Sequence, residues 1–280
     1  VEKPTVVSGS IRFSTFDTMN DDYDNSSRLL AKNDETIYLD FETNERIDID
    51  SLTVEINGYT LTSTDVTNTD TFGKQWQAAF TPTGLDTNVN DVSFQIKSIT
   101  DTAGNTEDTL LSFNADDSQK TVRIDVEKPD IGNILIVSSN PNSGFAKAGD
   151  NLTLSFTTSE VVRNPVEYLN IQGVGPVDLS TSDNGTNWIA KAQVRDNASG
   201  TPSLSLEVLD QAGNRGSPYF DNFSHITLDT FPPTLTGLSF VSSNQPDNSS
   251  IYAKAQDNLT LSFQFQEPIQ TPIVSIAGDN

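Results

Sequence analysis

Carboxylate side chains recur at matching places along this chain, and their types and spacing could build cation sites. Three segments share a Phe-x-x-x-Glu frame, which ends at Glu45, Glu160 and Glu267. A second pattern, Asp-x-Ala-Gly-Asn, spans residues 101–105 and returns at 210–214. Calcium takes about 6–8 oxygen ligands in flexible geometry and accepts carboxylate, amide and backbone oxygens. The repeated acids therefore indicate calcium chemistry, provided that the fold brings them together.

The spacing of these motifs predicts the domains that must position them. The copies recur at roughly 110 residues, which is the length of one β-sandwich and far above the period of solenoid repeats. We expect one sandwich over residues 1–126, a second over 127–230, and the N-terminal part of a third over 231–280. A third copy of this length cannot close a core, so the sequence is expected to be a piece of a longer protein.

Short apolar runs within each copy alternate with a period of two, which is typical of half-buried strands. Leu152, Leu154 and Phe156 show this pattern in the second copy, and equivalent runs lie at 37–41 and 259–263. Each complete copy has six recognisable strands with room for a seventh, and no segment has helical periodicity. The predicted fold is all-β, with tandem immunoglobulin-like antiparallel β-sandwich domains in an extended array.

The order of motifs in the second copy resembles a known family. An Asp-x-x-x-Pro linker begins at Asp125 and is followed by Ala-Lys-x-Gly-Asp-x-Leu-Thr-Leu-Ser-Phe at 146–156, Ser-Glu at 159–160, Trp-x-Ala at 188–190 and the turn at 210–214. This order looks like the bacterial immunoglobulin-like repeats of very large cell-surface proteins and adhesins. The resemblance implies an extracellular, cell-surface location and neighbouring domains of the same kind.

Sandwich topology predicts where the acidic residues meet. The loop after the Phe-x-x-x-Glu strand, the Asp-x-Ala-Gly-Asn turn and the incoming linker all lie at the entrance end of a domain. Oxygen-bearing side chains should therefore converge at each entrance, and the expected calcium ligands are Asp125, Glu127, Glu160, Asp210 and Asn214 for the second copy, Glu2, Glu45, Asp101 and Asn105 for the first, and Asp229 and Glu267 for the third. In the alternative interpretation, the turn's Asp and Asn only cap backbone groups, with no metal present.

Composition limits the partners. The chain carries 39 acidic against 16 basic residues, a net charge of −23, which disfavours nucleic acid and anionic membrane surfaces. Cations are the expected partners, and no direct membrane insertion is expected within this segment. The absence of Cys excludes disulfides, thiolate zinc sites and cysteine nucleophiles.

Other candidate chemistry is weaker. His225 is the sole histidine and no nucleophile motif accompanies it, so we expect no enzyme. Trp76 and Trp188 alternate with small residues and are predicted to be core rather than sugar-stacking. The acidic insertion near 17–25 is predicted to be a solvated loop. Asn-x-Ser/Thr sequons, which allow glycosylation in a suitable host, lie at Asn25, Asn151, Asn184, Asn197, Asn222, Asn248 and Asn258.

The sequence thus favours a non-enzymatic structural segment of a surface protein, an adhesin-like stalk that calcium stiffens at its domain junctions. Two hypotheses from other classes stay open. The chain could be a self-assembling subunit of a surface layer or filament, with copies of itself as partners. It could also supply the accessory modules of a secreted polysaccharide-acting enzyme.

Overall fold

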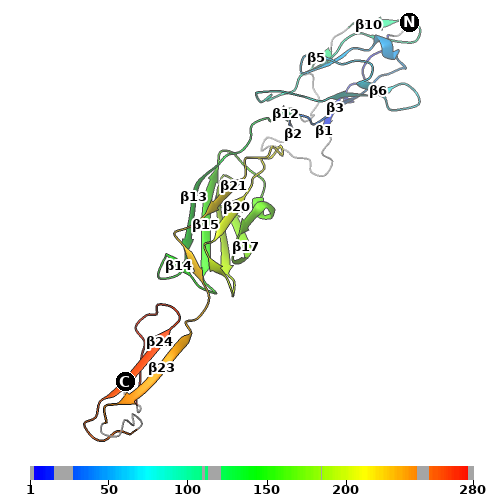
Figure 1. The fold of residues 1–280 in the computed structure, drawn as a ribbon. Coiled ribbons are helices and arrows are strands. Elements are labelled where there is room, and N and C mark those ends of the chain that lie inside the picture. The colour runs from blue at the N-terminus through cyan, green and yellow to red at the C-terminus, as the bar shows by residue number, and fades with distance from the viewer. Residues whose placement is uncertain are drawn as a thin grey trace.

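Three units follow one another along an elongated rod (Figure 1). The computed structural model describes residues 3–15, 28–108, 111–112, 121–183, 185–244 and 252–276. We call residues 3–126 the first unit, 127–230 the second unit and 231–276 the third unit. The insertion near 17–25, Glu2, and the sequons at Asn25, Asn184 and Asn248 lie outside the described residues.

The first unit packs sheets around one apolar cluster. One sheet has the order β1 (Arg12–Thr15), β3 (Ile37–Glu42), β7 (Gln75–Phe80) and β6 (Val66–Asn68). The other has the order β11 (Leu111–Ser112), β8 (Phe94–Ile96), β4 (Val54–Ile56) and β5 (Tyr59–Thr60). Two further pairs are β10 (Thr106–Glu107) with β9 (Ile99–Thr100), and β12 (Val122–Ile124) with β2 (Leu29–Ala31).

The second unit repeats this plan around its own apolar cluster. One sheet has the order β13 (Ile131–Ser138), β15 (Asn151–Thr158), β18 (Asn187–Val194) and β17 (Val174–Thr181). A second has the order β16 (Leu169–Ile171), β20 (Ser203–Leu206) and β21 (Tyr219–Asn222). A third has the order β14 (Phe145–Ala146), β22 (Thr227–Asp229) and β19 (Ser199–Gly200).

The predicted all-β, immunoglobulin-like fold is confirmed, and alternation explains it locally. Along β15, Leu152, Leu154 and Phe156 point inward and are at most 1% exposed, while the residues between them face outward. Burying each such side chain contributes about 1.5–3 kcal/mol, which selects the register that turns this face inward. Trp76 and Trp188 are buried as expected, at 3% and 5% exposure.

One strand pairing in each of the first two units is parallel and so departs from the predicted antiparallel sandwich. In the first unit β12 pairs with β2 in parallel, and in the second unit β22 pairs with β14 in parallel. The second unit shows how this pairing arises. Its first strand, β13, belongs to one sheet, and the next strand, β14, belongs to another sheet, where it pairs with β22, the last strand of the unit. Both strands of that pair run in the same direction along the unit, so their pairing must be parallel.

Short helices are the other departure from the predicted strands. They are η1 (Ile49–Ser51) and η2 (Pro165–Tyr168), capped by the side chains of Asp48 and Asn164. Each leads directly toward a strand, β4 or β16, in its unit. No helix in the described ranges is long and apolar enough to span a membrane.

The third unit consists of the antiparallel pair β23 (Leu235–Ser242) and β24 (Leu259–Phe265). Its alternation matches that of β13 and β15, yet Leu238 is 66% exposed, Phe240 52% and Phe263 37%. The equivalent of Phe263 in the second unit is Phe156, which is covered by the facing sheet. Within 231–276, the described residues include no such facing sheet.

Because the two apolar clusters are separate, a core substitution should act on one unit. Leu154→Ala removes a side chain with 0% exposure and should lower the free energy of unfolding of the second unit by about 2–5 kcal/mol. Variants that each keep a single tryptophan allow the two transitions to be followed by fluorescence in urea, with Trp188 reporting the second unit and Trp76 the first.

The matched control is Val137→Ala, on the outward face of β13 with 47% exposure, which should change the unfolding free energy by less than about 0.5 kcal/mol. An equal shift of the Trp76 transition in Leu154→Ala would contradict the independence of the two units.

Candidate metal centre

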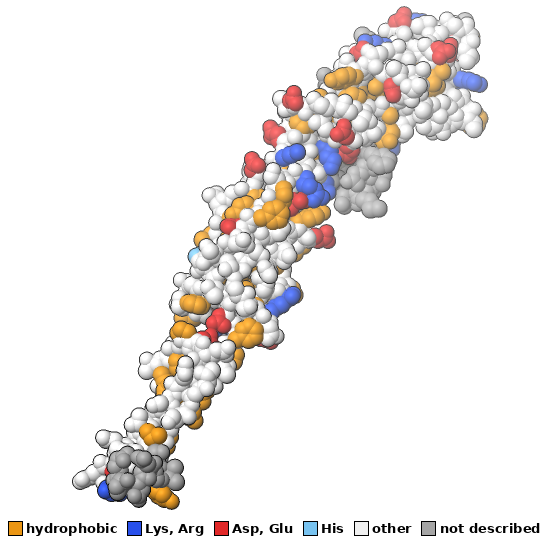
Figure 2. Space-filling view, viewed as in Figure 1, with side chains coloured by type: hydrophobic (Ala, Val, Ile, Leu, Met, Phe, Trp, Pro, Cys, Tyr) orange, Lys and Arg blue, Asp and Glu red, His pale blue; other side chains and the backbone are white. Residues whose placement is uncertain are grey.

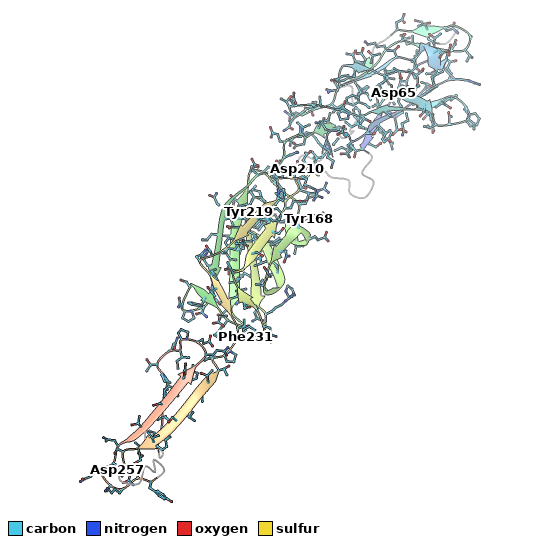
Figure 3. The ribbon with its side chains drawn as sticks, viewed as in Figure 1. Asp65, Tyr168, Asp210, Tyr219, Phe231 and Asp257 are labelled. Atoms are coloured by element: carbon cyan, nitrogen blue, oxygen red, sulfur yellow. The ribbon has the colours of Figure 1, made fainter. Side chains whose placement is uncertain are left out.

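Three carboxylates meet where the first and second units join. Asp125, Glu160 and Asp210 each present one oxygen, and these oxygens all lie within 4.8 Å of one another. Asp125 is 5% exposed and Asp210 1%, while Glu160 is half-buried. Figure 3 places Asp210 at the end of the second unit that faces the first. The linker, the loop after β15 and the Asp-x-Ala-Gly-Asn turn therefore converge as sandwich topology predicts.

Asp210 is held by its own turn. Its Oδ1 accepts a hydrogen bond from the backbone N–H of Asn214 at 2.7 Å, and its Oδ2 accepts one from Asn214 Nδ2 at 2.8 Å. Gly213 adopts φ +84°, in the left-handed region that favours glycine, and closes the turn. An antiparallel bridge between Val162 and Asp210 fixes the turn against the loop that carries Glu160.

Glu160 is positioned by a threonine that sequence analysis did not single out. The Thr158 hydroxyl is buried and donates to the Glu160 carbonyl at 2.6 Å. Thr43 makes the same contact with the Glu45 carbonyl in the first unit, at 2.7 Å. The signal was present in the sequence, because both copies read Phe-x-Thr-x-Glu; in the third copy the position holds Phe265.

Asp125 belongs to the linker and contacts both units. Its backbone N–H donates to the Ala31 carbonyl at 2.8 Å in the first unit, and its carbonyl accepts from Asn214 Nδ2 at 2.9 Å in the second. Its Oδ1 accepts from the Glu127 N–H at 3.2 Å. The Asp125 carboxylate thus lies at a fixed point between the units.

Basic side chains surround the acidic cluster. Arg123 forms an ion pair with Asp125 at 2.8 Å (Nη2 to Oδ2), and Lys32 Nζ of the first unit donates to the Gly213 carbonyl at 2.9 Å. Arg163 Nη2 donates to the Gln211 carbonyl at 2.8 Å in the same turn. Figure 2 shows Lys and Arg side chains gathered where the two units meet. Lys32 recurs in the sequence at the matching positions Lys147 and Lys254, but sequence analysis gave none of these three basic residues a role at the junction.

Two members of the cluster, Glu160 and Asp210, have raised pKa values. Burial raises the pKa of Glu160 to about 7, and the negative charges of Asp210, Asp125 and Glu127 add to this against the opposing charge of Arg123. Burial also raises the pKa of Asp210, although the hydrogen bonds from Asn214 oppose the change. The repulsion between these groups is what a divalent cation would relieve.

The donor set fits calcium better than other metals. It supplies carboxylate oxygens only, with backbone carbonyls nearby, whereas zinc prefers His or Cys ligands and magnesium a stricter octahedron. No hydrogen-bond donor reaches the Glu160 carboxylate within the ranges that the structure describes. Asn214 presents its amide nitrogen to Asp125 and Asp210 and so orients the cluster, while Glu127 is exposed and contributes charge at its edge.

The equivalent turn of the first unit has the same hydrogen bonds and a different charge environment. Asp101 is buried and accepts from the Asn105 N–H at 2.8 Å and from Asn105 Nδ2 at 2.6 Å. Those bonds hold the pKa of Asp101 below its usual range. Glu45 Oε1 is buried without a hydrogen-bond partner among the described residues. No group of three acids forms here in the part of the chain described, and Glu2 lies outside it.

At the junction of the second and third units, the remaining two predicted ligands share one hollow. Asp229 and Glu267 both line a space of about 690 Å³, together with Lys147 and the Pro-rich linker around Phe231. Figure 3 places Phe231 at this opposite end of the second unit. The two acids are brought to one place, without a third acid among the residues described there.

The sequons within the described ranges are accessible. Asn151, Asn197, Asn222 and Asn258 are all exposed. Their exposure would let a glycosylating enzyme reach them.

Comparison with known proteins finds similarity only among solved structures, all of low sequence identity. No family model and no curated protein sequence matches the chain. Among solved structures, fibronectin(III)-like modules of Clostridium thermocellum CbhA are 9% identical, with a TM-score of 0.34 over 78% of this chain and 93% of that one. The Ig1-2 module of the Drosophila receptor protein tyrosine phosphatase DLAR is 10% identical, with a TM-score of 0.26 over 82% of this chain and 100% of that one. Bacteroides ovatus SGBP-B, solved with a mixed-linkage heptasaccharide, is 17% identical, with a TM-score of 0.21 over 79% of this chain and 49% of that one.

The raised pKa of Glu160 gives a pH prediction for the calcium-free protein. Because the folded-state pKa is about 7 against an ordinary 4.5, stability is highest below pH 4.5 and is lost as the pH rises through 7. Allowing for partial exposure, Glu160 should account for about 1–2 kcal/mol of this loss. Urea unfolding of the second unit in excess chelator, followed through Trp188 between pH 4.5 and 8, measures it.

Glu160→Gln removes the titrating group, so the variant should be more stable than the unmodified chain at pH 8 and should show a flatter pH dependence. Glu167→Gln, at an exposed acid of η2, should leave the slope unchanged. Identical slopes for the unmodified chain and Glu160→Gln would refute the assignment.

Proposed function

We propose that this chain is a non-enzymatic structural segment of an extracellular cell-surface protein, an adhesin-like stalk whose unit junctions are stiffened by calcium. The observation that carries the proposal is the convergence of Asp125, Glu160 and Asp210 within 4.8 Å at a junction between units. The motif order that resembles bacterial surface repeats supports the stalk and its location.

The proposed mechanism follows from the position of Asp125. It directly follows β12, the last strand of the first unit, while Glu160 and Asp210 belong to the second unit. Without calcium, the three carboxylates repel one another and only Arg123 balances Asp125 directly. Asp125, Glu160 and Asp210 would together hold a calcium ion, with Glu160 in its ionised form, and the shared ion would restrict bending between the linker and the second unit.

Small-angle scattering of the whole chain tests this proposal. In millimolar calcium, the range in which extracellular modules typically bind, the maximum dimension should be larger and the distance distribution narrower than in excess chelator. Glu160→Gln should lose at least about tenfold in calcium affinity by titration calorimetry and should scatter alike in both conditions.

Glu167→Gln serves as the control and should respond to calcium as the unmodified chain does. The proposal would be abandoned if the unmodified chain had the same maximum dimension in calcium and in chelator.

A second candidate, a self-assembling surface-layer or filament subunit, is favoured by one observation. The third unit exposes the apolar face around Leu238, Phe240 and Phe263, and the largest apolar patches of proteins often mark association sites. Sedimentation velocity in millimolar calcium separates the two functions, because a stalk segment stays monomeric.

For an assembling subunit, concentration-dependent larger species should form, and Leu238→Ser should reduce them because it removes a 66% exposed apolar side chain from the contact. Val137→Ala on the second unit is the control. A chain that sediments as a monomer at every concentration would leave the stalk as the better account.

A further inference from the structure

The outward face of the sheet β16, β20 and β21 carries a row of side chains that neither the core nor the junction uses. Asn170 pairs with Ser205 across the sheet, and Ser205 pairs with Phe220, so the three point to the same outer side. Strands lie about 4.8 Å apart, which puts Phe220 about 10 Å from Asn170. Phe220 is 69% exposed, the most exposed aromatic side chain described in the second unit.

The next row on this face is also polar. Ser203 pairs with Asn222, and the Ser203 hydroxyl donates to Gln172 Oε1 at 2.9 Å. The side chains of Asn170, Ser205 and Asn222 make no hydrogen bond within the part of the chain that the structure describes. They present amide and hydroxyl groups, each able to donate and to accept, without a net charge.

The surface above these rows is hollowed. One hollow of about 430 Å³ is lined by Asn170, the β20 residues 203–205 and the β21 residues 220–222. A second, of about 640 Å³, is lined by residues 169–177, Val166, Arg195 and Ser203. Both include Asn170 and Ser203, so the two hollows adjoin at these residues, and each volume is in the range of small-ligand sites. We call the two adjoining hollows the groove.

Tyr168 extends the same face one row further. It is 40% exposed, and the Arg215 guanidinium lies 5.5 Å from its ring centre while also pairing with Glu207. Tyr168 lines neither hollow, and its ring lies beyond them. The groove itself therefore combines one exposed aromatic ring, Phe220, with the amide and hydroxyl groups of Asn170, Ser205 and Asn222.

We propose that this groove binds a neutral polysaccharide chain. A pyranose ring offers an apolar C–H face, which the exposed Phe220 ring can cover, and hydroxyl groups, which suit the amides and hydroxyls of Asn170, Ser205 and Asn222. Two adjoining hollows, each as large as a small-ligand site, suit a chain of sugars rather than one sugar. The net charge of −23 opposes acidic polysaccharides, and the polar lining disfavours an apolar peptide or lipid.

This site is independent of the calcium centre, which is built from Asp125, Glu160 and Asp210 in other segments. Binding is therefore tested in excess chelator, so that failure of the calcium proposal cannot alter the result. The whole chain, produced without N-glycosylation so that Asn222 is unmodified, is run by affinity electrophoresis in gels that contain xylan, galactomannan, mixed-linkage β-glucan, hydroxyethylcellulose or pullulan, with alginate as the acidic comparison.

At least one neutral polysaccharide should retard the unmodified chain, and Phe220→Ala should weaken that binding about tenfold because the stacking surface is lost. Asn170→Ala and Ser205→Ala should weaken it less. The matched control is Phe145→Ala, which removes a 44% exposed ring from β14, away from the groove, and should bind as the unmodified chain does.

Three results would overturn the proposal: no retardation by any neutral polysaccharide, retardation by alginate alone, or unchanged binding by Phe220→Ala. An equal loss in Phe145→Ala would do the same, since it would locate the binding elsewhere. The urea unfolding curve of Phe220→Ala, read through Trp188, should match that of the unmodified chain, which separates loss of binding from loss of fold.

Discussion

The repulsion between buried carboxylates at the first junction is the constraint around which the joint is organised. Asp125 and Asp210 are almost fully buried beside Glu160, and burying an ionised carboxylate is costly unless hydrogen bonds or opposite charge compensate it. The structure supplies part of that compensation through Asn214 and Arg123. The negative charge that is not compensated raises the pKa of Glu160, so additional positive charge at the joint would be stabilising.

The two copies of the Asp-x-Ala-Gly-Asn turn show that the surroundings of the turn decide whether the pKa of its Asp is raised or lowered. Asp101 and Asp210 accept the same hydrogen bonds from an Asn four residues later, yet the pKa of Asp101 is lowered and that of Asp210 is raised. The difference is the stronger burial of Asp210 and the charge of Asp125 beside it. One repeat motif can therefore cap a turn in one unit and also belong to a cluster of three acids in the next.

In the second unit, the acidic cluster and the groove lie in different places, one at an end of the sandwich and the other on a face of a sheet. The end of the unit carries the acids that meet the linker, whereas the outward face of β16, β20 and β21 carries the groove with Phe220. A sandwich allows this because its strands are held by the inward residues, such as Leu204 and Leu206 on β20, which leaves the outward positions free to vary. A rigid rod of such units would hold the groove at a fixed orientation along its length.

The sequence alone determined the strands, because a period of two reports which side chains face inward, and it also identified Glu160, Asp210 and Asp125 as acids that sandwich topology brings to one end. It could not predict the contact of Lys32 with Gly213 or the groove at Phe220, because both depend on contacts between residues far apart in the chain. Nor could it predict the parallel pairing of β14 with β22, since no local pattern encodes which sheet a two-residue strand joins. Local alternation is a property of neighbouring residues, whereas burial, charge and partner choice depend on everything that folding brings near, so only the tertiary structure decided them.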